Sequence, residues 1–133
     1  MKIKDKTLIL LLRITGGYHF SIGIIAYLFP AAFYVLASYT GEFSQHFIQD
    51  VGASYITAGS MLILATFRLE WRLPLSIAGG TFLLLHALLH LYETISGIRN
   101  IMYVLMEVFT IMLPTILVVV VVVASLSTKE EHC

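Results

Sequence analysis

Four long apolar segments dominate this chain and limit what it can fold into. They cover about residues 7–29, 51–67, 73–92 and 101–126. Each is close to the ~20 residues that an α-helix needs to cross the hydrocarbon core of a bilayer. With 59% hydrophobic and 12% charged side chains in 133 residues, the composition is too apolar for a soluble domain of this size. The sequence therefore predicts an all-α fold, a single integral membrane four-helix bundle over residues 1–133.

Basic residues predict the orientation of this bundle. Most of the Lys and Arg residues fall on one side of it, namely Lys2, Lys4, Lys6, Arg68, Arg72 and Lys129. Because cytoplasmic loops are enriched in Lys and Arg, we expect both termini to be cytoplasmic. Arg13 and a glycine pair interrupt the first apolar run, so we expect a retained span rather than a cleaved secretory signal.

The connections between the spans carry a second set of expectations. Residues 68–74 read as a tight charged turn, which predicts antiparallel neighbours on either side of it. The long connection 30–49 lacks Lys and Arg and is rich in aromatic residues, so it is expected to be an outer loop with a short helix on the membrane surface. Asp50, after this loop, is expected to cap the second span.

Ionisable side chains recur at membrane depth on every predicted span. They are His19 on the first, Asp50 at the start of the second, His86, His90 and Glu93 on the third, and Glu107 on the fourth. A charged side chain inside a bilayer costs ~2.5–3.5 kcal/mol on insertion scales, so such residues usually have partners or a function. With a rise of ~1.5 Å per residue, they fall near or within the outer half of the bundle. We predict that they meet there in one cluster for ligand binding or proton relay.

Small residues predict where the spans approach each other closely. Gly16 and Gly23 share a helix face with His19, and Gly52 and Gly59 share a face of the second span. On these faces two backbones can pack tightly next to the cluster.

The fourth span carries a polar stripe of its own. Tyr103, Glu107, Thr110 and Pro114 are spaced so that they point one way, with a kink expected at the proline. The stripe should face the bundle, because lipid offers Glu107 no hydrogen bond.

Several chemistries suit the cluster. The spacing of His86, His90 and Glu93 is typical of ligands for zinc or non-haem iron, with Glu107 or His19 completing the set. A haem held by His19 and a histidine of the third span is geometrically allowed but has less support. A His–carboxylate group can also bind a quinone head group and manage its protons, or relay protons in a transporter. The alternative without chemistry is a hydrogen-bonded seam that fixes helix register.

The chain also resembles a known family. The residues that carry the likeness are Phe47, Asp50, Val51, Gly52, Tyr55 and Gly59, then the basic turn 68–74, then His86 and His90. This pattern resembles the small four-helix membrane proteins of the DoxX-like group. The resemblance implies the four-helix architecture, and some members of the group are associated with quinol-oxidising or redox complexes.

The leading functional hypothesis is a small accessory subunit of a membrane redox complex, with the cluster binding a quinone, metal or other small ligand. The alternatives are a structural or assembly subunit and a proton-coupled transporter. Whether the protein is an enzyme stays open. The expected partners are the lipid bilayer, of a bacterial or archaeal-type plasma membrane, and other membrane subunits or a second copy. Nucleic acid is not expected, because the net charge is zero and no basic stripe occurs.

Overall fold

The computed structural model describes residues 5–37, 42–97 and 101–129, which are helical over most of their length. The helices are α1 (Asp5–Leu28), α2 (Pro30–Leu36), α3 (Gln45–Leu64), α4 (Leu69–Ile95), α5 (Ile101–Glu107) and α6 (Leu113–Lys129), with the π-helical segment η1 (Val108–Met112) between α5 and α6. Helices α1, α3 and α4 and the stretch Val104–Ala124 are long and apolar enough to cross a membrane. The predicted all-helical fold with four candidate spans is confirmed.

The helix boundaries differ from the expected ones in two places. Helix α3 begins at Gln45, because the Ser44 hydroxyl oxygen accepts a hydrogen bond from the Phe47 backbone N–H at 3.4 Å and caps the helix. The expectation that Asp50 caps this span is therefore wrong, and Asp50 lies in the second turn. Within the connection expected over 30–49, α2 is a short helix as predicted, but the first turn of α3 already lies inside this range, so the connection ends earlier than expected.

The turn expected over 68–74 also needs correction. Helix α4 begins at Leu69, so most of this segment, including Pro74, is helical. As a result Arg72 belongs to the first turns of α4, where it is 6% exposed and forms an ion pair with Asp5 at the start of α1. The pair ties together the ends of two helices.

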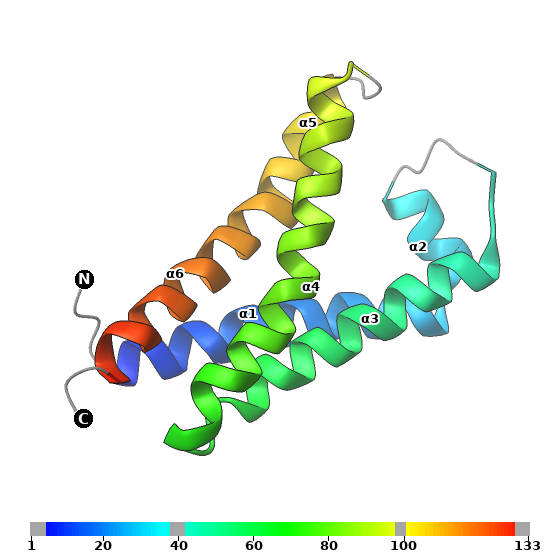
Figure 1. Cartoon of the computed structure of the whole chain (residues 1–133). Helices are drawn as coiled ribbons and strands as arrows, with labels where there is room; N and C mark the ends of the chain where they lie inside the picture. The colour runs from blue at the N-terminus through cyan, green and yellow to red at the C-terminus, as the bar shows by residue number, and fades with distance from the viewer. Residues whose placement is uncertain (1–4, 38–41, 98–100, 130–133) are drawn as a thin grey trace.

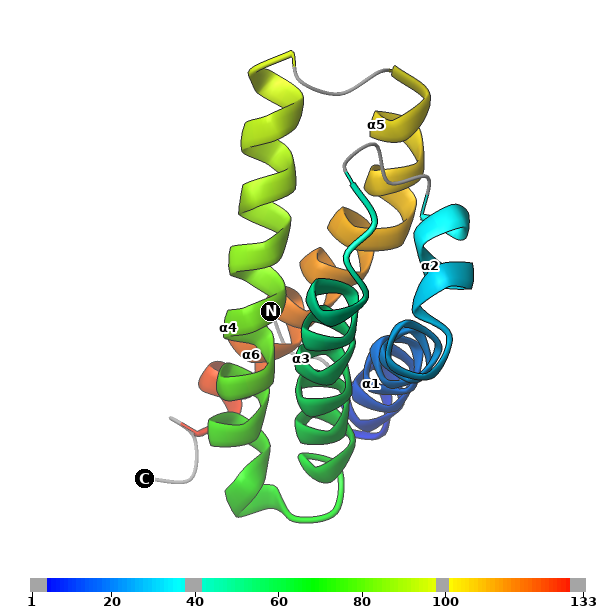
Figure 2. The ribbon, with the colours of Figure 1, turned by 90° about the vertical axis from the view of Figure 1, so that its right-hand side faces the viewer.

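The helices are arranged as two pairs. Helix α1 packs along α3, and α4 packs against α6. The two pairs are joined by contacts of α4 with α3 and of α6 with α1. Figure 1 shows the α4–α6 pair rising steeply away from the α1–α3 pair, and Figure 2 shows α3 and α4 side by side along their linked ends. The expected neighbour order of the second, third and fourth spans is confirmed.

Glycines let α1 and α3 approach closely, as the sequence predicts. A Cβ atom on Gly59 would lie 2.5 Å from the backbone nitrogen of Phe20, and one on Gly23 would lie 2.6 Å from that of Ile56. No side chain fits at these distances, so the two backbones are in direct contact. Gly17, by contrast, faces open space.

One end of the bundle is closed by buried leucine side chains. At the end where α1 begins and α6 finishes, Leu8, Leu12 and Leu62 are at most 1% exposed. We call this the closed end. Towards α2 and the tip between α4 and α5, the two helix pairs diverge (Figure 1). The ionisable residues of α4 and α5 lie on this diverging side.

Candidate functional site

A hydrogen-bonded chain of ionisable side chains joins α4 to α5. The His90 Nδ1 atom lies 2.8 Å from Glu107 Oε1, and His90 Nε2 lies 3.1 Å from His86 Nε2. The side chains of His90 and Glu107 are only 13% and 10% exposed. We refer to these three residues as the Glu107–His90–His86 chain. The structure thus brings together three of the side chains that the sequence singles out.

The donors and acceptors in this chain follow from the chemistry of imidazole. A Glu107 carboxylate can only accept, so His90 donates from Nδ1–H. A neutral His90 then accepts at Nε2 from the Nε2–H of His86, whereas a protonated His90 donates from Nε2 to His86. These two patterns interconvert when protons move along the chain. The arrangement can therefore pass a proton between the two histidines without moving either ring.

Aromatic rings extend the site from α4 to α3 and α1. The His86 ring stacks on Phe82 with centroids 5.7 Å apart and meets Tyr55 edge to face at 5.4 Å. On its other side Tyr55 stacks on His19 at 5.8 Å. His19 in turn donates its Nδ1–H to the Thr15 backbone carbonyl at 2.7 Å. A ring contact through Tyr55 therefore connects His19 to the Glu107–His90–His86 chain.

Pro114 accounts for the irregular backbone that carries Glu107. It has no N–H to give to the Thr110 carbonyl, and the hydroxyl of Tyr18 donates to that oxygen at 2.8 Å. The π-helical segment lies just before the proline, as expected for a strained helix at this residue. Because this segment changes the helix register, the Thr110 side chain is exposed, while Glu107 is buried as predicted.

Of the two remaining candidates, Glu93 lies close enough to interact electrostatically with His86, and Asp50 lies apart from the site. Glu93 follows His90 by one turn and is partly exposed. Asp50 has a side chain that is 66% exposed and pairs with His46 on the same helix at 3.4 Å. The structure places Asp50 on the surface of α3, away from the Glu107–His90–His86 chain.

The geometry bears on the metal and haem hypotheses. Among the residues that the structure describes, no group of three or more His, Cys, Asp or Glu side chains is arranged to hold a metal ion. The facing Nε2 atoms of His86 and His90 are hydrogen-bonded to each other, and Glu107 occupies the other nitrogen of His90. The Tyr55 ring packs against His86 and His19, where a haem bound between them would need space.

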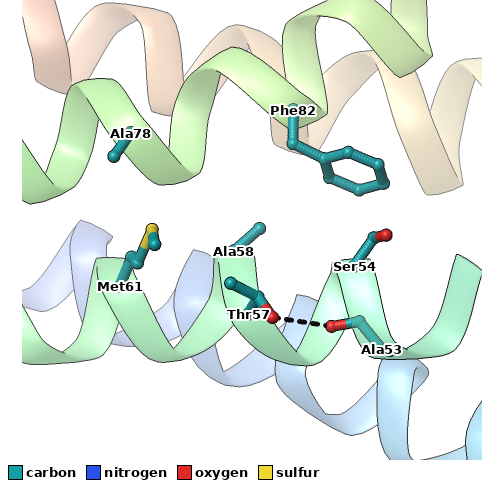
Figure 3. Close-up of a pocket in the computed structure, with 7 residues that line it drawn as sticks. All are labelled: Ala53, Ser54, Thr57, Ala58, Met61, Ala78 and Phe82. Atoms are coloured by element: carbon teal, nitrogen blue, oxygen red, sulfur yellow. Dashed lines mark hydrogen bonds between the residues drawn. The ribbon is translucent and has the colours of Figure 1, made fainter. Parts of the chain in front are cut away.

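A groove between α3 and α4 lies next to the Glu107–His90–His86 chain. It measures about 310 Å³, and Figure 3 shows its lining residues, which are Ala53, Ser54, Thr57, Ala58, Met61, Ala78 and Phe82. Phe82 belongs both to this groove and to the stack on His86. The sequence reasoning missed the groove, although Phe82 lies one turn before His86 on the same helix face.

No protein-family model, curated protein or solved structure matches this chain. The resemblance to the DoxX-like group stays a prediction.

Proposed function

We propose that the protein is a small integral membrane subunit of a redox complex, in which the Glu107–His90–His86 chain exchanges a proton with the head group of a quinone or hydroquinone. The observation that carries this proposal is the pair of hydrogen bonds at His90, 2.8 Å to Glu107 and 3.1 Å to His86. The resemblance to DoxX-like proteins supports the association with a redox complex. The distribution of Lys and Arg supports cytoplasmic termini.

The location of this chain favours proton chemistry over a purely structural role. A carboxylate and two imidazoles in a lipid-facing bundle are costly, and apolar side chains would pack the same helices at lower cost. Histidine changes its charge near neutral pH, and a neighbouring carboxylate fixes which nitrogen carries the proton. The chain therefore has the components of a relay that can accept a proton at one end and hold it at the other.

The proposed step is an acid–base reaction. A hydroquinone O–H bond breaks and an N–H bond forms on His86, while the proton on His86 Nε2 moves to His90 Nε2. The resulting imidazolium of His90 is stabilised by Glu107 at 2.8 Å. Oxidation of the hydroquinone anion then belongs to a redox-active partner subunit, which takes up the electrons.

Binding of a short-chain hydroquinone tests the proposal. The purified protein in lipid nanodiscs is titrated with ubiquinol-1 by calorimetry, for the wild type and for His90→Phe and Glu107→Gln. His90→Phe removes the group that takes up the proton from His86, so we expect hydroquinone binding to weaken about tenfold or more. Glu107→Gln keeps an acceptor for His90 Nδ1–H but removes the charge that stabilises its imidazolium, so binding should weaken less. His46→Gln is the matched control, because His46 is an exposed histidine outside the chain. Wild-type protein that does not bind, or a His90→Phe variant that binds unchanged, contradicts the proposal.

An assembly role is the second candidate, and the ring contacts between His86, Tyr55 and His19 favour it. The contacts from His86 through Tyr55 to His19 connect α4, α3 and α1 and could serve to fix helix order. Under this alternative, replacing both His86 and His90 by Ala abolishes complex assembly without changing any bound cofactor. Intact assembly with lost hydroquinone binding supports the proton-exchange function instead.

A proton-coupled transporter has less support. Leu8, Leu12 and Leu62 at the closed end are at most 1% exposed. They separate His19 from the Asp5–Arg72 ion pair at that end. A transporter predicts pH-dependent flux in liposomes that Glu107→Gln abolishes.

A further inference from the structure

Arg13 is a charged side chain on a candidate membrane span, and no described carboxylate pairs with it. It lies on α1, and its side chain is exposed. The described acidic side chains at the closed end pair with other cations, Asp5 with Arg72 and Glu70 with Arg68. A guanidinium on a lipid-facing surface needs an anion, because hydrocarbon offers none. We propose that Arg13 binds the phosphate of an anionic phospholipid in the leaflet at the closed end, independently of the proposed proton exchange.

A hydrogen bond to Thr66 places the Arg13 guanidinium near the level of a helix end. The Arg13 Nε–H donates to the Thr66 hydroxyl oxygen at 3.3 Å, and Thr66 follows the end of α3 at Leu64. The backbone of Arg13 lies about 12 Å along α1 from its first residue, at a rise of ~1.5 Å per residue. The long side chain therefore brings its charge back towards the closed end, as arginines in membrane spans do.

Trp71 supports this assignment of depth. It lies in the first turn of α4, at the same end of the bundle, and is 48% exposed. The Arg68 guanidinium lies 5.6 Å from the centroid of the Trp71 ring. Exposed tryptophans and basic residues are typical of the level where a span meets the lipid headgroups. The closed end therefore has the composition of a headgroup layer around Arg13.

The bond to Thr66 orients the guanidinium and leaves its outer edge for a ligand. The Thr66 hydroxyl donates its own hydrogen to the Ile63 carbonyl at 2.8 Å, so its oxygen accepts from Arg13. The two terminal nitrogens of Arg13 have no hydrogen-bond partner among the residues that the structure describes. A rigid, planar pair of N–H donors matches two oxygens of a phosphate. The free edge of Arg13 is therefore suited to a phosphate group.

The apolar surface next to Arg13 favours a lipid as the source of the phosphate. Leu10 and Ile14 are 56% and 57% exposed on the same helix. Gly17 lies one turn further from the closed end, and a Cβ atom there would meet nothing within 4 Å. An acyl chain attached to a phosphate at Arg13 can run along Ile14 and Gly17 towards the middle of the span. An anionic lipid is favoured over a zwitterionic one, because its phosphate charge is not offset by a cation of its own.

Lipid titrations with a matched arginine control test the proposal. The purified protein in detergent is titrated with phosphatidylglycerol or phosphatidylcholine of the same acyl chains, and native mass spectrometry gives the dissociation constant of the first bound lipid. We expect Arg13→Gln to weaken phosphatidylglycerol binding about fivefold and phosphatidylcholine binding less than about twofold. Arg68→Gln removes the same charge at the same end, from an arginine that pairs with Glu70. It should weaken phosphatidylglycerol binding less than about twofold.

A second variant keeps the test valid if Arg13→Gln does not fold. Arg13→Lys retains the charge but loses the planar pair of donors, so its affinity for phosphatidylglycerol should lie below that of the wild type. Equal affinity in the wild type and both Arg13 variants would overturn the proposal, as would a wild type that does not prefer phosphatidylglycerol to phosphatidylcholine. Inorganic phosphate that displaces phosphatidylglycerol at equal concentration would overturn the assignment to a lipid. Hydroquinone binding is not involved in any of these outcomes.

Discussion

At the scale of single residues, His90 is the central member of the Glu107–His90–His86 chain. Both of its ring nitrogens are hydrogen-bonded, Nδ1 to Glu107 and Nε2 to His86. Glu107 sets the direction of the hydrogen bonds, because its carboxylate accepts from His90 Nδ1–H and leaves His90 Nε2 to bond with His86. Changing either partner therefore alters the protonation pattern of the whole chain.

Glu107 offers a direct test of this dependence. We expect Glu107→Ala to lower the free energy of unfolding by about 1.5–3 kcal/mol, because a buried, charged hydrogen bond is lost. Glu107→Gln should lose less, since the amide oxygen still accepts from His90. Unfolding in mixed micelles followed by circular dichroism measures both, with the exposed Glu42→Gln as control. Equal losses for the two Glu107 variants would mean that His90 does not depend on this acceptor.

We expect substitutions of the two partners in the Asp5–Arg72 ion pair to affect stability unequally. Arg72 has a side chain that is 7% exposed, whereas that of Asp5 is 66% exposed. Asp5→Ala leaves the buried guanidinium of Arg72 without its partner. We expect it to lower the free energy of unfolding by about 2–3 kcal/mol, somewhat less than the ~3–5 kcal/mol lost when a fully buried pair is broken. Arg72→Met leaves only an exposed carboxylate and should cost clearly less. The same unfolding assay measures both, and the reverse order would contradict the asymmetry.

Individual residues show what the sequence could and could not predict about the site. Depth and helix face were enough to bring His86, His90 and Glu107 together, because both depend only on helical geometry. Asp50 was misplaced because Ser44 starts the helix earlier and the carboxylate then faces outward with His46. Phe82 carried no signal of its own, since an aromatic residue on a span is ordinarily packing.

At the scale of helices, the contact between α1 and α3 is made by backbone and not by large side chains. Gly59→Ala places a Cβ 2.5 Å from the Phe20 backbone nitrogen, so the two helices must separate. We expect the free energy of unfolding to fall by about 1–3 kcal/mol. Gly17→Ala meets nothing within 4 Å and should be neutral or stabilising by up to ~1 kcal/mol, from helix propensity. Thermal unfolding in detergent compares the two variants. A Gly59→Ala protein as stable as Gly17→Ala would contradict the close packing.

The π-helical segment is the element that aims Glu107 at α4. In Pro114→Ala the new N–H can donate to the Thr110 carbonyl, so the segment can become regular α-helix and turn Glu107 by about 100° relative to α6. We expect the His90–Glu107 hydrogen bond to be lost, with Pro74→Ala as the control proline variant. Imidazole ¹⁵N shifts of His90 report the change. An unaltered His90 signal in Pro114→Ala would show that the proline does not set the position of Glu107.

The helices themselves were largely predictable, since hydropathy gives the existence of a span and helix period gives its polar face. The boundaries were less so, because they depend on caps such as Ser44 and on the helical turns before Pro74. A kink was expected at Pro114, but the sequence does not show that the irregularity takes the form of a π-helical segment, or that the Thr110 carbonyl finds its donor in Tyr18 on another helix.

At the scale of the whole molecule, the two ends of the bundle have different characters. The end with Leu8, Leu12 and Leu62 is closed and tied by the Asp5–Arg72 pair, while the two helix pairs diverge towards the other end (Figure 1). The Glu107–His90–His86 chain and the Phe82 end of the groove lie away from the closed end, while the Met61 end of the groove lies beside Leu62.

The most direct test of this account is a ¹⁵N–¹⁵N correlation between the imidazoles of His86 and His90, recorded by solid-state NMR on the protein in lipid bilayers. We expect a cross-peak between the two Nε2 atoms, which lie 3.1 Å apart, and a hydrogen-bonded Nδ1–H on His90. We further expect that added hydroquinone shifts both signals and leaves those of His46 unchanged. Two histidines without a mutual cross-peak, with shifts like those of exposed His46, would contradict this hydrogen-bonded arrangement.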